Sequence, residues 1–288
     1  MTSIVKIMRS LRTMPPFPDV AARVMAIVRD PEYALDDLVG VVRTDPALTT
    51  RILKLSNSSL FGLAREVTSV AEAVTFIGSR NLVKLVLVSC TGSYFRNLPA
   101  NEYADPTAMW QQTLACSTAC QMLAERTRYE QPTTAFTAGI LHNIGRIALL
   151  QVVEPELLAA AGRELRYPAA SPVEVERRVL GIDHAAAAGA VTEAWNLPTE
   201  LRRAVQNHHD ELLLDSDDRL TALLHTADEL VMKLGIGDPQ PLRPHAPAAP
   251  ALRRLGLAAE DADAVGELVV AELARVGKLL NPEPASSR

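Results

Sequence analysis

The segment AFTAGILHNIGRIALL, residues 135–150, constrains the fold more than any other stretch of this chain. Its apolar residues dominate every side of a helix, which predicts a helix buried in a protein core. A polar pair, His142 and Asn143, interrupts it near the centre. A buried polar group is unfavourable unless it has a partner, so the pair predicts a site where other polar side chains meet. Asn143 also places an amide where a metal-dependent hydrolase would need a carboxylate.

Composition sets outer limits on the kind of protein. The chain has 288 residues, of which 48% are hydrophobic and 22% charged, enough for one large or two smaller globular domains. The net charge of −5 gives no general reason to expect nucleic-acid binding. We find no uncharged apolar run of about 18 residues and therefore expect no membrane span. The apolar part of MTSIVKIMRSLRTMPP is too short for a signal peptide.

Three cysteines, an odd number without metal-type spacing, predict reduced thiols and a cytoplasmic protein. Two of them, Cys116 and Cys120, are four residues apart and share one face of a predicted helix. We interpret both as core residues, because free cysteine behaves as a small apolar side chain.

Periodicity predicts an all-α fold. Strand-like alternation and hairpin signals are scarce, whereas helix signals recur. Asp45 followed by Pro46 is typical of a helix start, and Ser69 with Glu72 forms a capping-box pattern. The predicted helices cover residues 18–30, 35–44, 46–56, 70–78, 79–95, 107–128, 132–152, 154–165, 172–180, 184–195, 198–209, 217–234 and 259–280.

A polar, proline-containing stretch at residues 97–106 predicts the division of the chain. We expect an N-terminal helical lobe over residues 1–100 and a second helical lobe over residues 101–288. The second lobe contains a proline-rich loop at residues 235–250 and a final amphipathic helix. The apolar stripe of that helix packs most simply on its own lobe, and a homodimer contact is the alternative. The stripe consists of Val265, Leu268, Val269, Leu273, Val276 and Leu280.

All six histidines follow residue 140, and five of them lie on predicted helices or helix ends. Histidines on successive helices can converge in the core of a bundle, where metal sites are built. The alternative is a set of capping or hydrogen-bonded core histidines. His245, in the proline-rich loop, is expected to be exposed and uninvolved. The other five are His142, His184, His208, His209 and His225.

Several motifs resemble the HDOD family. In the first half these are MPPFPDVAARVMAIVRDPE, TDPALTTRILKLSNS and VTSVAEAVTFIGSRNLVKLVL. In the second half they are MWQQTLACSTACQMLAE, AFTAGILHNIGRIALL, GIDHAAAAGAVTEAWNLP and AVQNHHD. The resemblance covers about residues 10–235. It implies a helical N-terminal lobe and a second lobe related to the HD and HD-GYP metal-dependent phosphohydrolases, in a family used as bacterial signalling or regulatory modules.

The resemblance also implies a residue correspondence with the catalytic HD enzymes. Their first histidine corresponds to Gln112, their His-Asp pair to His142 and Asn143, and their later aspartate to Asp228. The further histidines of binuclear members correspond to His184 and to His208 or His209. Two of the four central positions have therefore changed to amides.

Amides are weak metal ligands, and losing an anionic ligand removes Coulomb attraction in a low-dielectric pocket. A metal pair able to generate hydroxide is therefore not expected, and no catalytic residue is assigned. No cofactor is expected, although one divalent metal held by His142, His184, His208 and Asp228 remains open. The competing interpretation is a hydrogen-bonded polar network in a vestigial pocket.

We therefore expect a non-catalytic bacterial signalling module, a pseudoenzyme that acts by binding a signalling protein. The alternatives are a metal-dependent phosphohydrolase acting on a nucleotide or cyclic dinucleotide, and a nucleotide sensor without turnover. Nucleic acid and membrane are not expected as partners, and self-association remains open. The candidate pocket consists of Gln112, His142, Asn143, His184, His208, His209 and Asp228.

Overall fold

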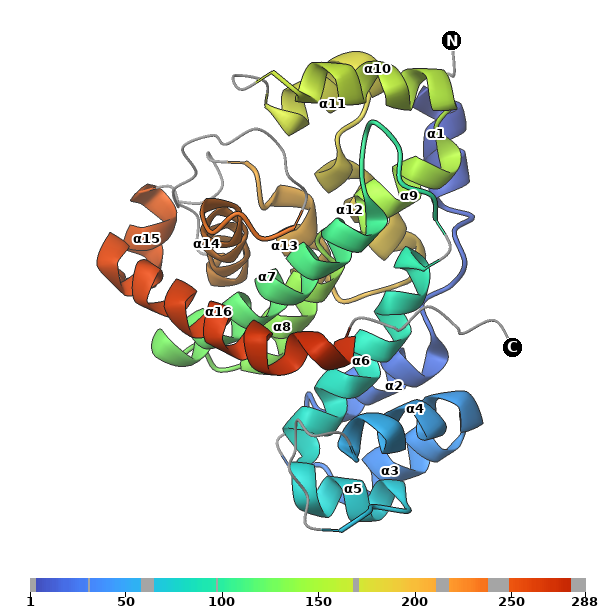
Figure 1. Ribbon diagram of the computed structural model, residues 1–288, viewed down its shortest axis with the longest axis vertical. Helices are drawn as coiled ribbons and strands as arrows, with labels where there is room; N and C mark the ends of the chain where they lie inside the picture. The colour runs from blue at the N-terminus through green and yellow to red at the C-terminus, as the bar shows by residue number, and fades with distance from the viewer. Residues whose placement is uncertain are drawn as a thin grey trace. The chain divides into compact units, whose positions relative to one another are not determined.

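Every regular element that the computed structural model describes is a helix, which confirms the predicted all-α class (Figure 1). The proline-rich loop at 235–250 lies largely outside the described residues, and His245 lies wholly outside them. The structure describes residues 4–30, 32–57, 65–96, 98–167, 171–210, 218–237 and 249–280, with side chains up to residue 274.

The chain forms two compact units. Unit 1 contains residues 1–16 and 92–267, and unit 2 contains residues 17–91 and 268–288. These units differ from a division at residue 100, because the first 16 residues group with the second half of the chain and the last 21 with the first half.

Unit 2 contains short helices and most of the longer helix α6. They are α2 (Asp19–Ile27), α3 (Leu35–Arg43), α4 (Pro46–Ser56), α5 (Val70–Ile77) and most of α6 (Ser79–Phe95). Helix α3 packs on α2, α4 and α5 and contributes the fully buried Leu38 and Val42. As predicted, Asp45 caps α4: its carboxylate accepts a hydrogen bond from the Leu48 N–H at 2.9 Å, and Pro46 opens the helix.

The predicted capping box at the start of α5 is present in a modified form. Ser69 Oγ accepts the Glu72 N–H at 3.1 Å, while the Glu72 carboxylate accepts the N–H of Thr68 rather than that of Ser69. Ser69→Ala is expected to lower the free energy of unfolding of unit 2 by about 1 kcal/mol. Urea unfolding followed by far-ultraviolet circular dichroism measures this, and Thr75→Ala on the exposed face of α5 is the control expected to show no loss.

In unit 1, the long helix α7 packs along α8 (Figure 1). Helix α14 packs against both α7 and α8, and α13 packs against α8 and α14. Helix α12 packs against both α9 and α13. Helix α1 packs on α9 and α12, and the start of the chain belongs to this unit because of these contacts. The helices are α1 (Ile4–Leu11), α7 (Pro106–Arg126), α8 (Pro132–Leu141), α9 (Ile144–Val152), α10 (Pro155–Leu165), α11 (Pro172–Leu180), α12 (His184–Ala194), α13 (Thr199–Asn207), α14 (Arg219–Lys233), α15 (Ala249–Leu255) and the first part of α16 (Ala259–Leu280).

The helix predicted over residues 132–152 is divided in two, which corrects the sequence analysis. Helix α8 ends at Leu141 and α9 begins at Ile144, so His142 and Asn143 form the junction between them. Gly139 and Gly145 flank the junction, and at each of them the backbone of another helix lies too close to leave room for a Cβ atom. A Cβ on Gly139 would lie 2.5 Å from Ser117 Cα on α7, and one on Gly145 would overlap the backbone of α12. The polar pair is therefore fixed where α8 and α9 meet α7 and α12.

The apolar stripe expected along α16 is interrupted. Val265 and Val269 are buried, as predicted, but Leu268 is 58% exposed. Leu268 follows Val265 by three residues, so the buried side of the helix is narrower than the sequence pattern indicates.

No individual helix within the described ranges has the length and apolar character needed to cross a membrane, although α5 and α6 taken together would pass by length and composition, with a bend of 118° between them.

Candidate functional site

All seven residues of the candidate pocket lie in unit 1 and occupy neighbouring helix faces or ends. Helix α7 carries Gln112, the α8–α9 junction carries His142 and Asn143, and α14 carries Asp228. His184 is the first residue of α12, and His208 and His209 directly follow α13. Six are buried, and the His209 side chain is the most accessible at 23% exposure.

Asp228 contacts His142 and Gln112 through one carboxylate oxygen and His209 through the other. One carboxylate oxygen, Oδ1, lies 3.4 Å from His142 Nε2 and accepts a hydrogen bond of 3.2 Å from the Gln112 amide. The other oxygen, Oδ2, lies 3.8 Å from His209 Nε2. Gln112 also donates to the sulfur of Met232, 3.0 Å away.

Asn143 bonds to helix α7 through its amide. Its Nδ2 donates a hydrogen bond of 3.3 Å to the hydroxyl of Thr113, the residue after Gln112 on α7. The side chain thus ties the helix junction to α7. An aspartate at this position would supply a negative charge, whereas the amide supplies none.

A buried carboxylate binds the His184 imidazole through Nδ1, the ring nitrogen that does not face His209. Glu176 on α11 accepts hydrogen bonds of 2.7 Å from both Nδ1 and the backbone N–H of His184. The second oxygen of Glu176 accepts from the Tyr103 hydroxyl at 2.8 Å and from Arg146 Nε at 3.3 Å. The ring is thereby fixed in one orientation, with Nε2 facing His209 at 3.0 Å.

Hydrogen bonds assign the same tautomer to three of the histidines. Nδ1 of His142 lies 2.7 Å from the Gly139 carbonyl oxygen, and Nδ1 of His208 lies 2.7 Å from that of Val205. A carbonyl only accepts, so both Nδ1 atoms carry the proton, as does Nδ1 of His184 toward Glu176. In the neutral ring, Nε2 then presents a lone pair. Metal-binding histidines are held in this way, with the far ring nitrogen donating to a carbonyl or carboxylate.

Burial and neighbouring charges set the ionisation of the cluster. Burial, together with the nearby His184, lowers the pKa of His208 to about 3. Burial and the adjacent His208 lower the pKa of His209 well below its usual value. Burial alone would raise the pKa of Asp228, but the hydrogen bond and charge of His142 outweigh it and hold that pKa well below the usual range. Around neutral pH the cluster therefore contains one carboxylate and at least two neutral imidazoles.

The donor set is of a kind that can hold a transition metal, because imidazole, carboxylate and thiolate groups are ordinary ligands of such metals. His208 Nε2 and Gln112 Oε1 are buried and have no hydrogen-bond partner, and His142 Nε2 faces the Asp228 carboxylate at 3.4 Å. Two groups bring three ligand atoms within 4.8 Å of one another: His184, His208 and His209, and separately Cys116, His142 and Asp228. The sequence left open a single metal held by His142, His184, His208 and Asp228. In the structure these four residues fall into two groups, one of which also contains His209 and the other Cys116.

Sequence analysis missed the residues that support the cluster. Glu176 follows Val173 by three residues and precedes Leu180 by four, so it is a carboxylate on the apolar stripe of α11. Arg146 is a single charged residue within the apolar α9. A charge placed on a buried face signals a buried pair, and these two residues form one. Cys116 gave no such signal, because a thiol on an apolar face is typical of a core.

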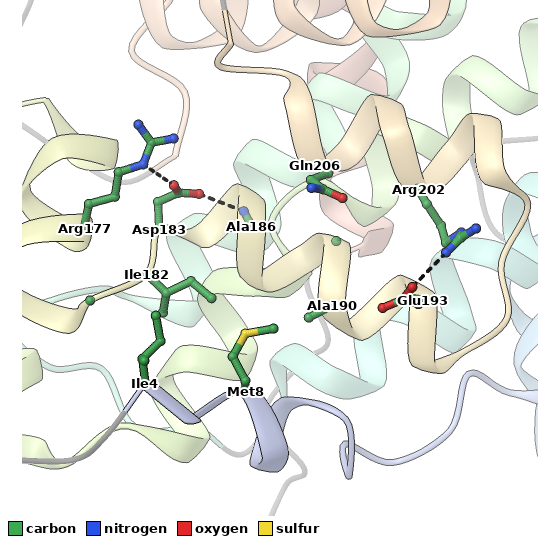
Figure 2. Close-up of a pocket in the computed structure, with 12 residues that line it drawn as sticks. Ile4, Met8, Arg177, Ile182, Asp183, Ala186, Ala190, Glu193, Arg202 and Gln206 are labelled. Carbon is green, nitrogen blue, oxygen red and sulfur yellow. Dashed lines mark hydrogen bonds and ion pairs between the residues drawn. The ribbon is translucent and has the colours of Figure 1, made fainter. Parts of the chain in front are cut away.

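A separate cavity of about 490 Å³ lies beside α12, between α1 and α13 (Figure 2). None of the seven candidate residues is among the described residues that line it. Ile4 and Met8 contribute an apolar wall, and Gly189 and Ala190 a wall of small residues. The cavity's arginines are paired: Arg177 with Asp183 at 2.5 Å and Arg202 with Glu193 at 3.4 Å.

These features define a class of protein: an all-helical chain whose second half gathers imidazoles and one aspartate into a buried cluster. Residues 14–211, well over half of the chain, match the model of the HDOD domain family. The chain belongs to the HDOD family.

Two solved structures share this fold. A candidate signal transduction protein from Marinobacter aquaeolei VT8 has a TM-score of 0.79 at 24% identity, over 93% of this chain and 59% of that one. A candidate phosphohydrolase from Shewanella amazonensis SB2B has a TM-score of 0.71 at 22% identity, over 96% of both chains. An uncharacterised protein of Treponema pallidum (strain Nichols) is 26% identical over 200 residues, which are 68% of this chain and 38% of that protein. The chain thus spans well under half the length of that relative.

Proposed function

We propose that this HDOD chain is a non-catalytic regulatory module of a bacterial, cytoplasmic signalling pathway, which acts by binding a partner protein or ligand. The carrying observation is the Asn143 amide, which bonds to Thr113 at a position where an HD hydrolase has a metal-binding aspartate. The residue can neither bridge two cations as an anion nor help to lower the pKa of a bound water.

The small number of negatively charged ligands in the pocket supports this proposal. Two divalent cations in one pocket repel each other, and a buried site must supply negative ligands to offset their charge. Among the residues described, Asp228 is the one ionised carboxylate that faces Nε2 atoms of the histidine cluster, those of His142 and His209. Glu176 lies on the far side of His184 and is already bonded to Arg146 and Tyr103. The pocket therefore lacks the anionic ligands that a hydrolytic metal pair uses.

The proposal predicts an absence of phosphodiesterase turnover. Protein purified without chelator and supplied with Mn²⁺ or Fe²⁺ is expected to hydrolyse cyclic dinucleotides and nucleotides no faster than metal alone. The matched control is the double variant Gln112→His with Asn143→Asp, which restores the ligand types of the catalytic relatives. Metal-dependent turnover by the unaltered chain, lost in His142→Ala, would contradict the proposal and support the phosphohydrolase alternative.

One observation favours a second candidate, a sensor that binds a nucleotide or another small molecule without converting it. The cavity of Figure 2 has about 490 Å³, within the range of small-molecule sites, and combines apolar walls with arginine side chains. A ligand at 100 times its Kd would raise the free energy of unfolding by about 2.7 kcal/mol. A thermal-shift screen of nucleotides tests this, and Ala190→Glu, which places a carboxylate in the cavity, is the variant expected to abolish the shift.

A further inference from the structure

Cys116 occupies a place on α7 that the comparison with HD enzymes does not assign. It follows Gln112 by four residues, so both side chains lie on the same face of the helix. Its sulfur, a ring nitrogen of His142 and a carboxylate oxygen of Asp228 all lie within 4.8 Å of one another. The thiol thus lies one helical turn from the position where the catalytic relatives have their first histidine.

The atoms around this sulfur are of the kinds that bind metal ions. His142 donates from Nδ1 to Gly139 and turns its Nε2 toward Asp228 Oδ1 at 3.4 Å. The imidazole and the carboxylate are held together in this way either by a proton or by a metal ion bound to both. Gln112 Oε1 is buried without a hydrogen-bond partner. Buried polar groups are normally satisfied, and a metal ion bound beside Cys116 would give this oxygen a partner.

We propose that Cys116, His142 and Asp228 bind one zinc ion, and that the Cys116 thiolate replaces the imidazole ligand lost at Gln112. Thiolate, imidazole and carboxylate are all ordinary zinc ligands, and this combination of soft and hard donors suits zinc better than Mg²⁺ or Ca²⁺. The Gln112 carbonyl oxygen is the nearest neutral donor for a fourth position. On binding, the Cys116 S–H bond breaks, the sulfur keeps the electron pair and bonds to zinc, and the proton leaves to solvent.

Charge balance favours this site over the neighbouring group of three histidines. The thiolate and the carboxylate together carry two negative charges, which offset the charge of one Zn²⁺ in a buried site. The group of three histidines supplies no anionic ligand, because an imidazole binds a metal as a neutral donor. His184 and His209 moreover lie within hydrogen-bond distance of each other, 3.0 Å between their Nε2 atoms, so they need no cation between them.

Cobalt substitution tests the thiolate directly. The reduced full-length chain, loaded with one equivalent of Co²⁺, is expected to show a near-ultraviolet thiolate-to-cobalt charge-transfer band. Cys116→Ser is expected to remove this band and weaken Zn²⁺ binding by roughly 100-fold or more, since loss of outer ligands alone costs 10–100-fold. The matched control is Cys120→Ser, an equally buried cysteine one turn further along α7, which is expected to keep the band.

X-ray absorption of the zinc-loaded unaltered chain tests the same ligand set without a variant that could fail to fold. One sulfur neighbour at about 2.3 Å with nitrogen or oxygen neighbours at about 2.0–2.1 Å is expected. A shell of nitrogen and oxygen only, a cobalt band that survives in Cys116→Ser, or no metal binding would each overturn the proposal. These measurements detect ligands and not turnover, so their outcome is independent of whether the module is catalytic.

Discussion

Gly145→Ala is expected to lower the free energy of unfolding of unit 1 by about 3 kcal/mol or more, the upper part of the range for overpacking a core. Gly145 is the point where α9 contacts the first turn of α12. A Cβ there would overlap the carbonyl oxygen of His184 and lie 2.6 Å from the backbone nitrogen of Ala188. Backbone atoms cannot rotate away as a flexible side chain can, so α9 and α12 would have to separate.

Both tryptophans, Trp110 and Trp195, lie in unit 1, so urea unfolding followed by tryptophan fluorescence reports on this unit. The matched control is Gly266→Ala on α16, another buried helical glycine of the same unit. Its Cβ would lie 3.0 Å from the end of the Leu230 side chain, which can move, so a change within about 1 kcal/mol is expected. Equal behaviour of the two variants would show that close contact between α9 and α12 is not required.

Most helices were predictable because their signals are local. Residues 172–180 and 184–195 were expected as helices and are observed as Pro172–Leu180 and His184–Ala194. Helix α1 was missed, although Ile4, Ile7, Met8 and Leu11 have the spacing of one helical face. That stretch was considered only as a leader sequence, whereas its buried Ile7 and Leu11 help to pack α1 in unit 1.

The interruption at His142 and Asn143 could not be derived from periodicity. The apolar pattern continues on both sides, so the segment has the signature of a single helix. The break depends on contacts with other parts of the chain, namely Gly139 against Ser117 on α7 and Gly145 against His184 on α12. Tertiary packing overrides local pattern at such points, and functional sites are where this is expected.

With Gln112 and Asn143 as amides, the ligands that the HD comparison names carry too little negative charge for a pair of metal ions. The observed bond from Asn143 to Thr113 is consistent with that count. Cys116 is not among those ligands, because spacing along α7 does not reveal which face meets Asp228. A single ion with a thiolate ligand and the absence of a hydrolytic pair are therefore compatible.

Glu176→Gln is expected to lower the free energy of unfolding of unit 1 by about 3–5 kcal/mol at neutral pH, as for other broken buried ion pairs. Glu176 is fully buried and accepts hydrogen bonds from Tyr103, Arg146 and His184. Burial alone would raise its pKa, but the positive charge and hydrogen bond of His184, with Arg146, lower it to about 2. Glutamine removes the negative charge that pairs with Arg146 and turns an amide donor toward groups that already donate.

The pH dependence of the free energy of unfolding distinguishes the contribution of the Glu176 charge from that of its packing. A carboxyl group whose pKa falls from 4.5 to about 2 on folding contributes about 3 kcal/mol above pH 4.5, and loses it as the pH falls from 4.5 toward 2. The difference in free energy of unfolding between the unaltered chain and Glu176→Gln should therefore shrink over this range. Glu102→Gln is the control, because Glu102 pairs with Arg163 and Arg166 at an exposed position where about 1 kcal/mol or less is expected. A difference that stays constant from pH 6 to pH 3 would show that the Glu176 charge does not stabilise the folded chain, and His184 would then owe its orientation to packing alone.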